Sequence, residues 1–312
     1  MGMSIANLEI INYRVLLPPM TQQLLDSELL DSEPSEFEPS EFEPITSLDI
    51  SHLVIEDDTP VDNFQSEEQQ RLLVEPLYSS KAIPSPFLAA ANVGLFYKLH
   101  GEPIVPDAML SVGVQRADDL TQRQNRSYFV WEFGKVPEVC IEIVSNQEGD
   151  ELTLSRKSQQ KGKTDPKKSI YAYVGVPYYV VFDPFQRLQG QNDMNGALLR
   201  VWMLSAGRYT ELTPAEGISE AGQFIWLETV GLGLALWEGQ YEDQVTRLWL
   251  RWCDRQGQVI PTGAEGLEME RQGREMERQG REMERQGREM ERQRADRLAD
   301  RLRAMGVNPD EI

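Results

Sequence analysis

Two carboxylates in this chain each lie inside a short apolar run. Asp107 lies within residues 104–110 and Glu142 within residues 139–145, and the second run is rich in β-branched side chains. Runs of this length are typical of mostly buried β-strands. Because burying a lone carboxylate is very costly, each must be paired, hydrogen-bonded or bound to a metal. Two of them on adjacent strands would form a divalent-metal site.

A pair of carboxylates of this kind suits phosphoryl chemistry. Their oxygens can hold Mg²⁺, with waters and a substrate phosphate completing the coordination. The ion then polarises a phosphoryl oxygen and acidifies a bound water, which a lysine can orient or deprotonate. In an Asp…Glu-x-Lys motif that lysine lies two residues after the glutamate, where this chain has Val144. The lysine must come from another segment, and the candidates are Lys157, Lys161, Lys163, Lys167 and Lys168.

Each of these residues also has a simpler interpretation. Asp107 follows a proline and is equally typical of a turn or the start of a strand. Glu142 would be ordinary on a sheet with one solvated face. Lys167 comes just before an apolar helical pattern, where a solvated lysine is as common as a catalytic one. Asp183 precedes a proline and is typical of a residue that caps a strand end.

The acidic side chains are concentrated near the N-terminus. The formal net charge is −20, and residues 1–75 carry 17 acidic and 2 basic side chains, whereas residues 76–263 are nearly neutral. This balance argues against an extended phosphate-binding surface but allows a local basic patch. Residues 1–63 are rich in Pro, Ser and Glu and contain the tandem repeat SEFEP at 35–44. That composition predicts an acidic, largely disordered arm.

The compartment follows from what the sequence lacks. Cys140 and Cys253 cannot build a disulfide framework, and the two histidines, His52 and His100, form no zinc-ligand spacing. No apolar run is long enough to span a bilayer. The N-terminus lacks a basic segment followed by an apolar one, as a signal peptide would require. We expect a cytoplasmic protein with no membrane segment.

The pattern of apolar residues predicts alternating helices and strands between residues 64 and 255. Residues 67–78 form an amphipathic pattern, and residues 86–97 form an apolar one that begins with Ser85 as N-cap. The polar segment 116–134 indicates a long hairpin connection. Further helices are expected at 170–175 and 241–253, and strands at 103–114, 136–145, 178–183, 198–204, 207–212 and 224–230.

The C-terminal region, residues 256–312, repeats every seven residues. One methionine recurs per heptad, at Met269, Met276, Met283 and Met290, and favourable Glu–Arg pairs recur four residues apart. One apolar residue per heptad is a thin seam for a coiled coil, and each glycine in the repeat costs about 1 kcal/mol against alanine. The repeat predicts a charged helix, either solvated or self-associated as a coiled coil.

Four motifs in this order carry a family resemblance. VPDAML, PEVCIEIVSN, KKSIYAYVGVPYY and VVFDP resemble the Uma-two family of restriction endonucleases, within the PD-(D/E)XK nuclease superfamily, over roughly residues 75–240. The resemblance implies that Asp107 and Glu142 are metal ligands and that the backbone carbonyl of Ile143 is a third. It also implies that Lys167, four residues before Tyr171, is the displaced catalytic lysine. Lys168 and Lys157 remain alternatives for that role.

We therefore predict an α/β protein with a restriction-endonuclease-like core, a mixed β-sheet flanked by helices. The core would span residues 64–255, between the disordered acidic arm 1–63 and the charged helical tail 256–312. The predicted activity is endonucleolytic hydrolysis of phosphodiester bonds in DNA with Mg²⁺ or Mn²⁺, the lysines of 157–168 contacting phosphates. The alternative is an inactive nuclease-fold protein that binds partners, or another copy of itself, through its arm and tail.

Overall fold

The computed structural model describes residues 50, 53, 63–147, 152–155, 164–191, 193–213 and 224–306. All described residues lie in one compact unit, Asp49–Ile312. The predicted disordered arm therefore lies outside the described residues, apart from Ile50, Leu53 and Asn63. Among the helices that the structure describes, none is both long and apolar enough to cross a bilayer.

The centre of the fold is a six-stranded mixed sheet with the order β1-β3-β5-β8-β9-β10. The β5–β8 pair is parallel, and all other neighbours are antiparallel. The predicted α/β class with a mixed sheet flanked by helices is confirmed. The strands are β1 (Phe87–Ala91), β3 (Ala108–Val112), β5 (Val139–Ile143), β8 (Tyr178–Phe182), β9 (Leu199–Ser205) and β10 (Arg208–Glu211).

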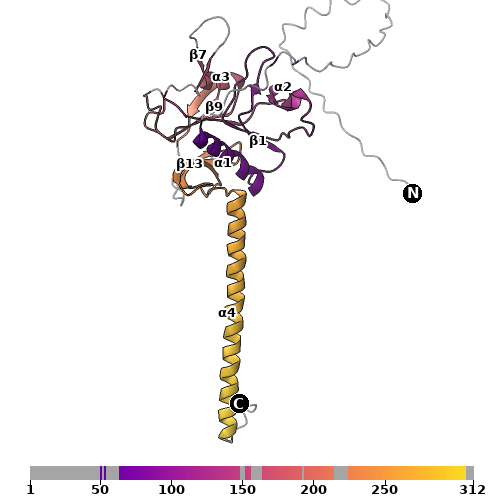
Figure 1. Ribbon diagram of the computed structural model, residues 1–312, viewed down its shortest axis with the longest axis vertical. Coiled ribbons are helices and arrows are strands. Elements are labelled where there is room, and N and C mark those ends of the chain that lie inside the picture. Colours follow the sequence, from indigo (N-terminus) through magenta and orange to yellow (C-terminus); the bar gives the residue numbers. More distant parts are fainter. Residues whose placement is uncertain are drawn as a thin grey trace, which may run out of the picture. The chain divides into compact units, whose positions relative to one another are not determined.

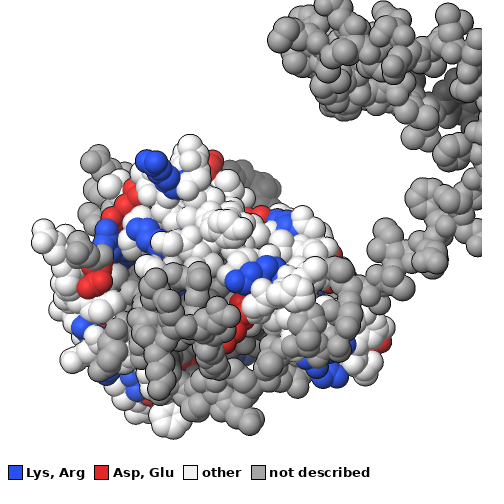
Figure 2. All heavy atoms as spheres, turned by 90° about the horizontal axis from the view of Figure 1, so that it is seen from above, with Lys and Arg blue, Asp and Glu red and all other residues white. Residues whose placement is uncertain are grey.

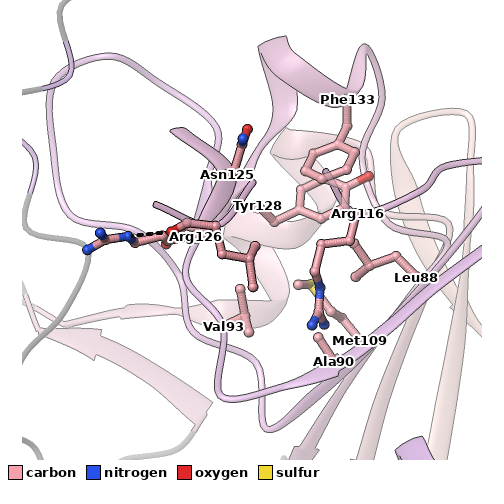
Figure 3. A pocket seen from close by; sticks show the side chains of 11 residues that line it. Leu88, Ala90, Val93, Met109, Arg116, Asn125, Arg126, Tyr128 and Phe133 are labelled. Atoms are coloured by element: carbon pink, nitrogen blue, oxygen red, sulfur yellow. Dashed lines mark hydrogen bonds between the residues drawn. The ribbon is translucent and has the colours of Figure 1, made fainter. Parts of the chain in front are cut away.

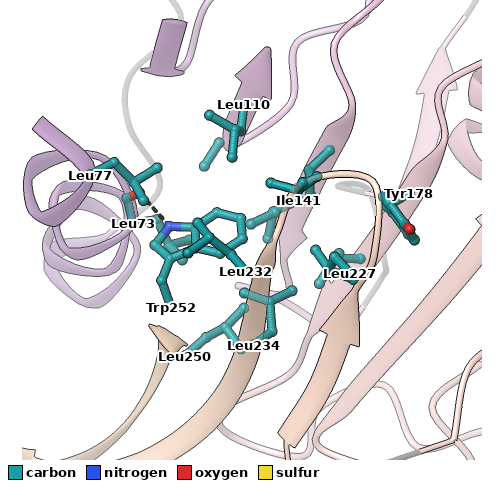
Figure 4. Close-up of a cluster of buried hydrophobic side chains, with 14 of the residues drawn as sticks. Leu73, Leu77, Leu110, Ile141, Tyr178, Leu227, Leu232, Leu234, Leu250 and Trp252 are labelled. Atoms are coloured by element: carbon teal, nitrogen blue, oxygen red, sulfur yellow. Dashed lines mark hydrogen bonds between the residues drawn. The ribbon is translucent and has the colours of Figure 1, made fainter. Parts of the chain in front are cut away.

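One face of this sheet packs against helix α1 and a second, three-stranded antiparallel sheet. Helix α1 spans Phe64–Ser80, begins at the N-cap Asn63, and lies between β1 and β13 in Figure 1. Figure 4 shows leucines from both sheets and from α1 surrounding Trp252, whose indole N–H donates to the carbonyl of Leu73 at 2.7 Å. The second sheet consists of β11 (Phe224–Leu227), β12 (Leu232–Gln240) and β13 (Thr246–Cys253).

The opposite face carries the shorter elements and a separate buried cluster. Alternation along the strands puts Cys140, Tyr179 and Trp202 on this side. Tyr179 stacks against Trp202 with ring centroids 5.4 Å apart. Apart from α1 and the C-terminal helix, the elements outside the two larger sheets are β2 (Leu95–Phe96), η2 (Arg123–Asn125), β4 (Tyr128–Phe129), α2 (Val130–Phe133), β6 (Thr153–Ser155), β7 (Thr164–Pro166) and α3 (Lys167–Val174).

A single long helix, α4, follows the second sheet (Figure 1). It spans Gly263–Ala304, and the capping box between Thr262 and Glu265 fixes its start. Glu265 also accepts from Arg251, a 2% exposed side chain on β13. Every described side chain of α4 is at least partly exposed. The predicted i,i+4 ion pairs are confirmed, and they are Glu270–Arg274, Glu277–Arg281 and Glu284–Arg288.

Two predicted helices are wrong, because tertiary pairing decides both segments. Residues 86–97 form β1 and β2, since all five residues of β1 pair with β3 and the hydroxyl of Tyr78 bridges the amide and carbonyl of Ala89. Residues 241–253 contain β13, whose aromatic and apolar side chains pair along β12. The segment 116–134 is more than the predicted connection, since it contains η2, β4 and all of α2.

We expect Glu265→Ala to lower the free energy of unfolding by about 2–4 kcal/mol, because it removes the capping box and leaves the Arg251 guanidinium without its carboxylate. Urea unfolding followed by circular dichroism measures the change. Glu268→Ala is the matched control, since Glu268 pairs only with exposed side chains of the same helix. Equal effects of the two substitutions would contradict the anchoring role of Glu265.

Candidate functional site

The two carboxylates identified in the sequence meet at one end of the central sheet. Strands β3 and β5 pair with Ala108 opposite Ile141. Continuing that antiparallel register by one residue puts Asp107 opposite Glu142. Asp107 lies immediately before β3 and is half-buried, whereas Glu142 lies inside β5 and is fully buried. The predicted proximity of the two side chains follows from this register.

Helix α3 supplies a hydrogen-bond donor to each oxygen of the Glu142 carboxylate. The ammonium of Lys167 donates to Oε2 at 2.8 Å, and the hydroxyl of Tyr171 donates to Oε1 at 2.8 Å. The two donors are four residues apart, so they share one face of the helix. Lys167 also donates to the carbonyl of Val105 at 3.0 Å, just before Asp107. The helix therefore fixes the orientation of the buried carboxylate.

Burial makes the Glu142 carboxylate unusually basic. The pKa of Glu142 is raised to about 8, chiefly by loss of water and also by the nearby negative charge of Asp107, against the favourable charge of Lys167. The hydrogen bonds from Lys167 and Tyr171 act in the opposite direction. A cation bound beside both groups would favour their ionised forms.

Asp107 is held by a strand amide and by helix α1. Its Oδ2 accepts from the amide of Ile143 at 2.6 Å, and its Oδ1 accepts from the side chain of Gln70 at 3.2 Å. Gln70 also exchanges hydrogen bonds with Asn92, whose amide donates back at 2.8 Å. Sequence reasoning missed the side-chain amides of Gln70 and Asn92. The only signal was the polar residue Gln70 within an amphipathic stretch, and nothing local tied it to Asp107.

The oxygen atoms at this sheet end fit a magnesium-type ion. The amide of Val144 points to β8 and that of Ile143 to Asp107. Because the carbonyl of an extended residue points to the same side as its amide, the carbonyl of Ile143 also faces Asp107. Within the described ranges, no three His, Cys, Asp or Glu residues gather. Two carboxylates, one carbonyl and waters match the hard, oxygen-rich coordination of Mg²⁺ better than that of Zn²⁺.

Of the two candidate lysines that the structure describes, Lys167 is the one whose ammonium contacts Glu142. Its neighbour Lys168 instead lies over the ring of Trp202, with the ammonium 3.7 Å from the centroid. Burial and the charge of Arg200 lower the pKa of Lys168. The remaining candidates, Lys157, Lys161 and Lys163, lie outside the described residues.

Asp183 organises the turn after β8. It is fully buried and accepts from the amide of Arg187 at 2.9 Å, the amide of Leu188 at 2.8 Å and the side chain of Gln189 at 2.9 Å. The guanidinium of Arg187 then donates to the carbonyl of Ser145 at 2.6 Å, which ties this turn to the end of β5. The contacts match the strand-end interpretation of Asp183.

We expect the apo protein to lose stability as the pH rises from about 4.5 to about 8. Because the folded-state pKa of Glu142 is raised, the folded protein holds a proton there that the unfolded chain has released. The decline from this one group is at most about 1.4 kcal/mol per pH unit. Glu142→Gln should remove it, whereas Glu102→Gln, in an exposed loop, should not. Urea unfolding in EDTA across this range measures both, and identical slopes for Glu142→Gln and wild type would contradict the burial argument.

Comparison with known proteins adds one match. A family model described as "Uma2: Putative restriction endonuclease" matches residues 34–217, which is more than half of the chain. Neither the comparison with curated proteins nor the comparison with solved structures gave a match. The matched range contains Asp107, Glu142 and Lys167 together with the Asp183 turn.

Proposed function

The chain belongs to the Uma2 family of restriction endonuclease-like proteins, and on that premise we propose that it is an endonuclease that hydrolyses phosphodiester bonds in DNA with Mg²⁺ or Mn²⁺. The observation that carries the proposal is the Lys167 ammonium, 2.8 Å from the Glu142 carboxylate at the sheet end where Asp107 lies. Lys167, on α3, thus supplies the positive charge that an Asp…Glu-x-Lys motif would carry at position 144, where this chain has Val144.

The proposed metal ligands are Asp107, Glu142 and the carbonyl of Ile143. A bound ion would polarise the phosphate and acidify a water. The protein's own contribution is orientation: Tyr171 and Lys167 fix Glu142, while Gln70 and the Ile143 amide fix Asp107. Ligand carboxylates held by such hydrogen bonds need little rearrangement when they bind.

Lys167 is proposed to act through its charge. Its ammonium donates to a carboxylate and to a backbone carbonyl at the same time, so it is held as a hydrogen-bond donor beside the two carboxylates. A donor in that place can orient a water and stabilise the negative charge that develops on a phosphate under attack. To remove a proton from the water, Lys167 would have to accept a hydrogen bond from it, whereas here it donates. We therefore assign to Lys167 the positioning of the water and the stabilisation of negative charge.

The surface charge supports a local rather than an extended contact with DNA. In the view of Figure 2, the basic and acidic side chains of the described residues are interspersed. Near the site, Lys168 and Arg200 both lie against Trp202, and Arg200 is paired with Glu211. Few phosphate contacts give a shallow dependence of affinity on salt. This is consistent with the nearly neutral composition of residues 76–263.

We expect Lys167→Ala and Glu142→Gln each to lower the rate of DNA cleavage at least about 100-fold, because each removes a charge at the reacting phosphate. Cleavage of supercoiled and linear DNA with Mg²⁺ or Mn²⁺, followed on gels, measures the rates. Glu238→Gln is the matched control, an exposed carboxylate on β12 of the second sheet. Cleavage that survives Glu142→Gln in the purified, folded protein would overturn the site assignment.

Gln70→Leu is expected to raise the Mg²⁺ concentration needed for half-maximal cleavage about 10–100-fold, because Asp107 loses the amide that orients it. The rate at saturating Mg²⁺ should change much less. Gln65→Leu, five residues earlier on α1, is the control. A fall in the saturating rate with an unchanged metal requirement would contradict a positioning role for Gln70.

A second candidate function is a non-catalytic interaction protein that uses the same fold. The observation that favours it is the exposed methionine seam of α4, where Met276 and Met283 are each 67% exposed. A chain without metal-dependent cleavage, whose apparent mass in solution exceeds that of one copy, would favour this candidate. Cleavage that depends on Glu142 and Lys167 would favour the nuclease.

A further inference from the structure

A cavity of about 300 Å³ opens beside the candidate site. Figure 3 shows Leu88, Ala90 and Met109 along one side and the rings of Tyr128 and Phe133 along another, with Arg116 reaching between them. The exposed side chains of Arg116 and Arg126 stand at its rim. The cavity therefore combines an apolar interior, an aromatic wall and a cationic mouth.

The cavity and the carboxylates share one strand and one face of the central sheet. Met109 lines the cavity and comes two residues after Asp107, which is about 7 Å along a strand. Met109 also pairs with Cys140, two residues before Glu142, so Met109 and Glu142 lie on the same face. A polymer with one unit bound at the carboxylates can therefore place its neighbouring unit in the cavity.

The aromatic wall is rigid. The rings of Tyr128 and Phe133 stack with centroids 4.3 Å apart and an angle of 14° between their planes. The hydroxyl of Tyr128 shares a 2.9 Å hydrogen bond with Ser111 and donates to the carbonyl of Lys135 at 3.2 Å. Tyr128 is only 1% exposed, so a planar group can stack only on the partly exposed ring of Phe133, in the way that proteins bind the bases of single strands.

The cationic mouth suits a phosphate. Within the part of the chain that the structure describes, the guanidinium of Arg116 has no hydrogen-bond or ion-pair partner. Arg126 donates to the carbonyls of Leu120 at 2.9 Å and Thr121 at 3.0 Å, which holds the rim loop in place. Arg116 is therefore available to pair with an anion at the mouth.

We propose that this cavity receives one unstacked base of the DNA strand whose phosphate lies at Asp107 and Glu142. The base stacks on the partly exposed ring of Phe133, which the buried ring of Tyr128 supports, and Arg116 contacts the adjoining phosphate. This inference rests on the proposed function and names its substrate more closely, as a strand with an unpaired or extruded nucleotide beside the cleaved bond. Enzymes that act on extruded bases gain selectivity because unpaired bases cost less to unstack.

Binding of short single strands in EDTA tests the proposal without cleavage. The probes are a fluorescently labelled eight-nucleotide oligothymidylate and an abasic strand of the same length and charge, and fluorescence anisotropy of the full chain gives both affinities. The wild type should bind the strand with bases at least about fivefold more tightly, the lower end of one base–aromatic contact. Phe133→Leu should abolish that preference and leave the abasic affinity unchanged.

Matched variants separate the base from the phosphate. Arg116→Ala should weaken both strands equally, whereas Arg208→Ala, an exposed arginine on β10 across the sheet, should weaken neither. Phe64→Leu, an 88% exposed aromatic residue, should keep the preference for bases. Should Phe133→Leu fail to fold, Tyr128→Leu removes the other ring of the wall.

The outcomes distinguish the two proposals. A preference for bases that survives loss of either ring, or no preference in the wild type, overturns the base cavity, even if the protein cleaves DNA with Mg²⁺. A preference that depends on Phe133 in a protein that cleaves no DNA supports the cavity and overturns the nuclease. Two results together support both proposals. They are tighter binding of the strand with bases that depends on Phe133, and faster cleavage of bubble or single-stranded DNA than of intact duplex.

Discussion

The ion pair between Lys167 and Glu142 lies where helix α3 packs on the central sheet. A fully buried carboxylate is costly unless its oxygens are satisfied, and here α3 supplies a donor for each oxygen. The same pair places the ammonium beside the backbone that leads into Asp107. The position of α3 and the arrangement of the site therefore depend on each other, because moving the helix would leave a charged group buried and unpaired.

Helix α1 links the same site to the second sheet through two neighbouring glutamines. Gln69 exchanges hydrogen bonds with the amide and carbonyl of Leu250 on β13, at 2.9 and 2.8 Å, as an adjacent strand would. Gln70, the next residue, donates to Asp107. Trp252 adds a hydrogen bond to the backbone of α1 within the apolar cluster. The second sheet thus supports the Asp107 end of the first through a single helix.

The C-terminal helix depends on a different buried charge. Arg251 extends from β13, and its guanidinium bonds to Glu265 and to the carbonyl of Ile260. It also lies 4.7 Å from the ring centroid of Trp237. Beyond this anchor, the repeats of α4 make ion pairs only with their own helix among the described residues. The number of heptads can therefore change without altering the contacts of the core.

The sequence by itself determined the features that depend on local pattern and on residue type. It identified strands β5 and β8, the greater part of α3, the heptad helix with its ion pairs, and the two carboxylates that burial makes conspicuous. Glu142 was recognisable because an acidic residue between two isoleucines needs a partner whatever the fold. The family motifs added the expectation that Lys167 belongs with these carboxylates.

Only the tertiary structure decided the remaining features, since they depend on residues far apart in the chain. The segments at 86–97 and 241–253 have apolar patterns that suit a helix or a strand, and pairing with β3 and β12 decides both. Gln70 is 37 residues from Asp107, and no local spacing predicts their contact. The choice of Lys167 over Lys168 likewise depends on which face of α3 packs against β5. Periodicity records which residues face inward, but contact between distant residues is fixed only when the whole core packs.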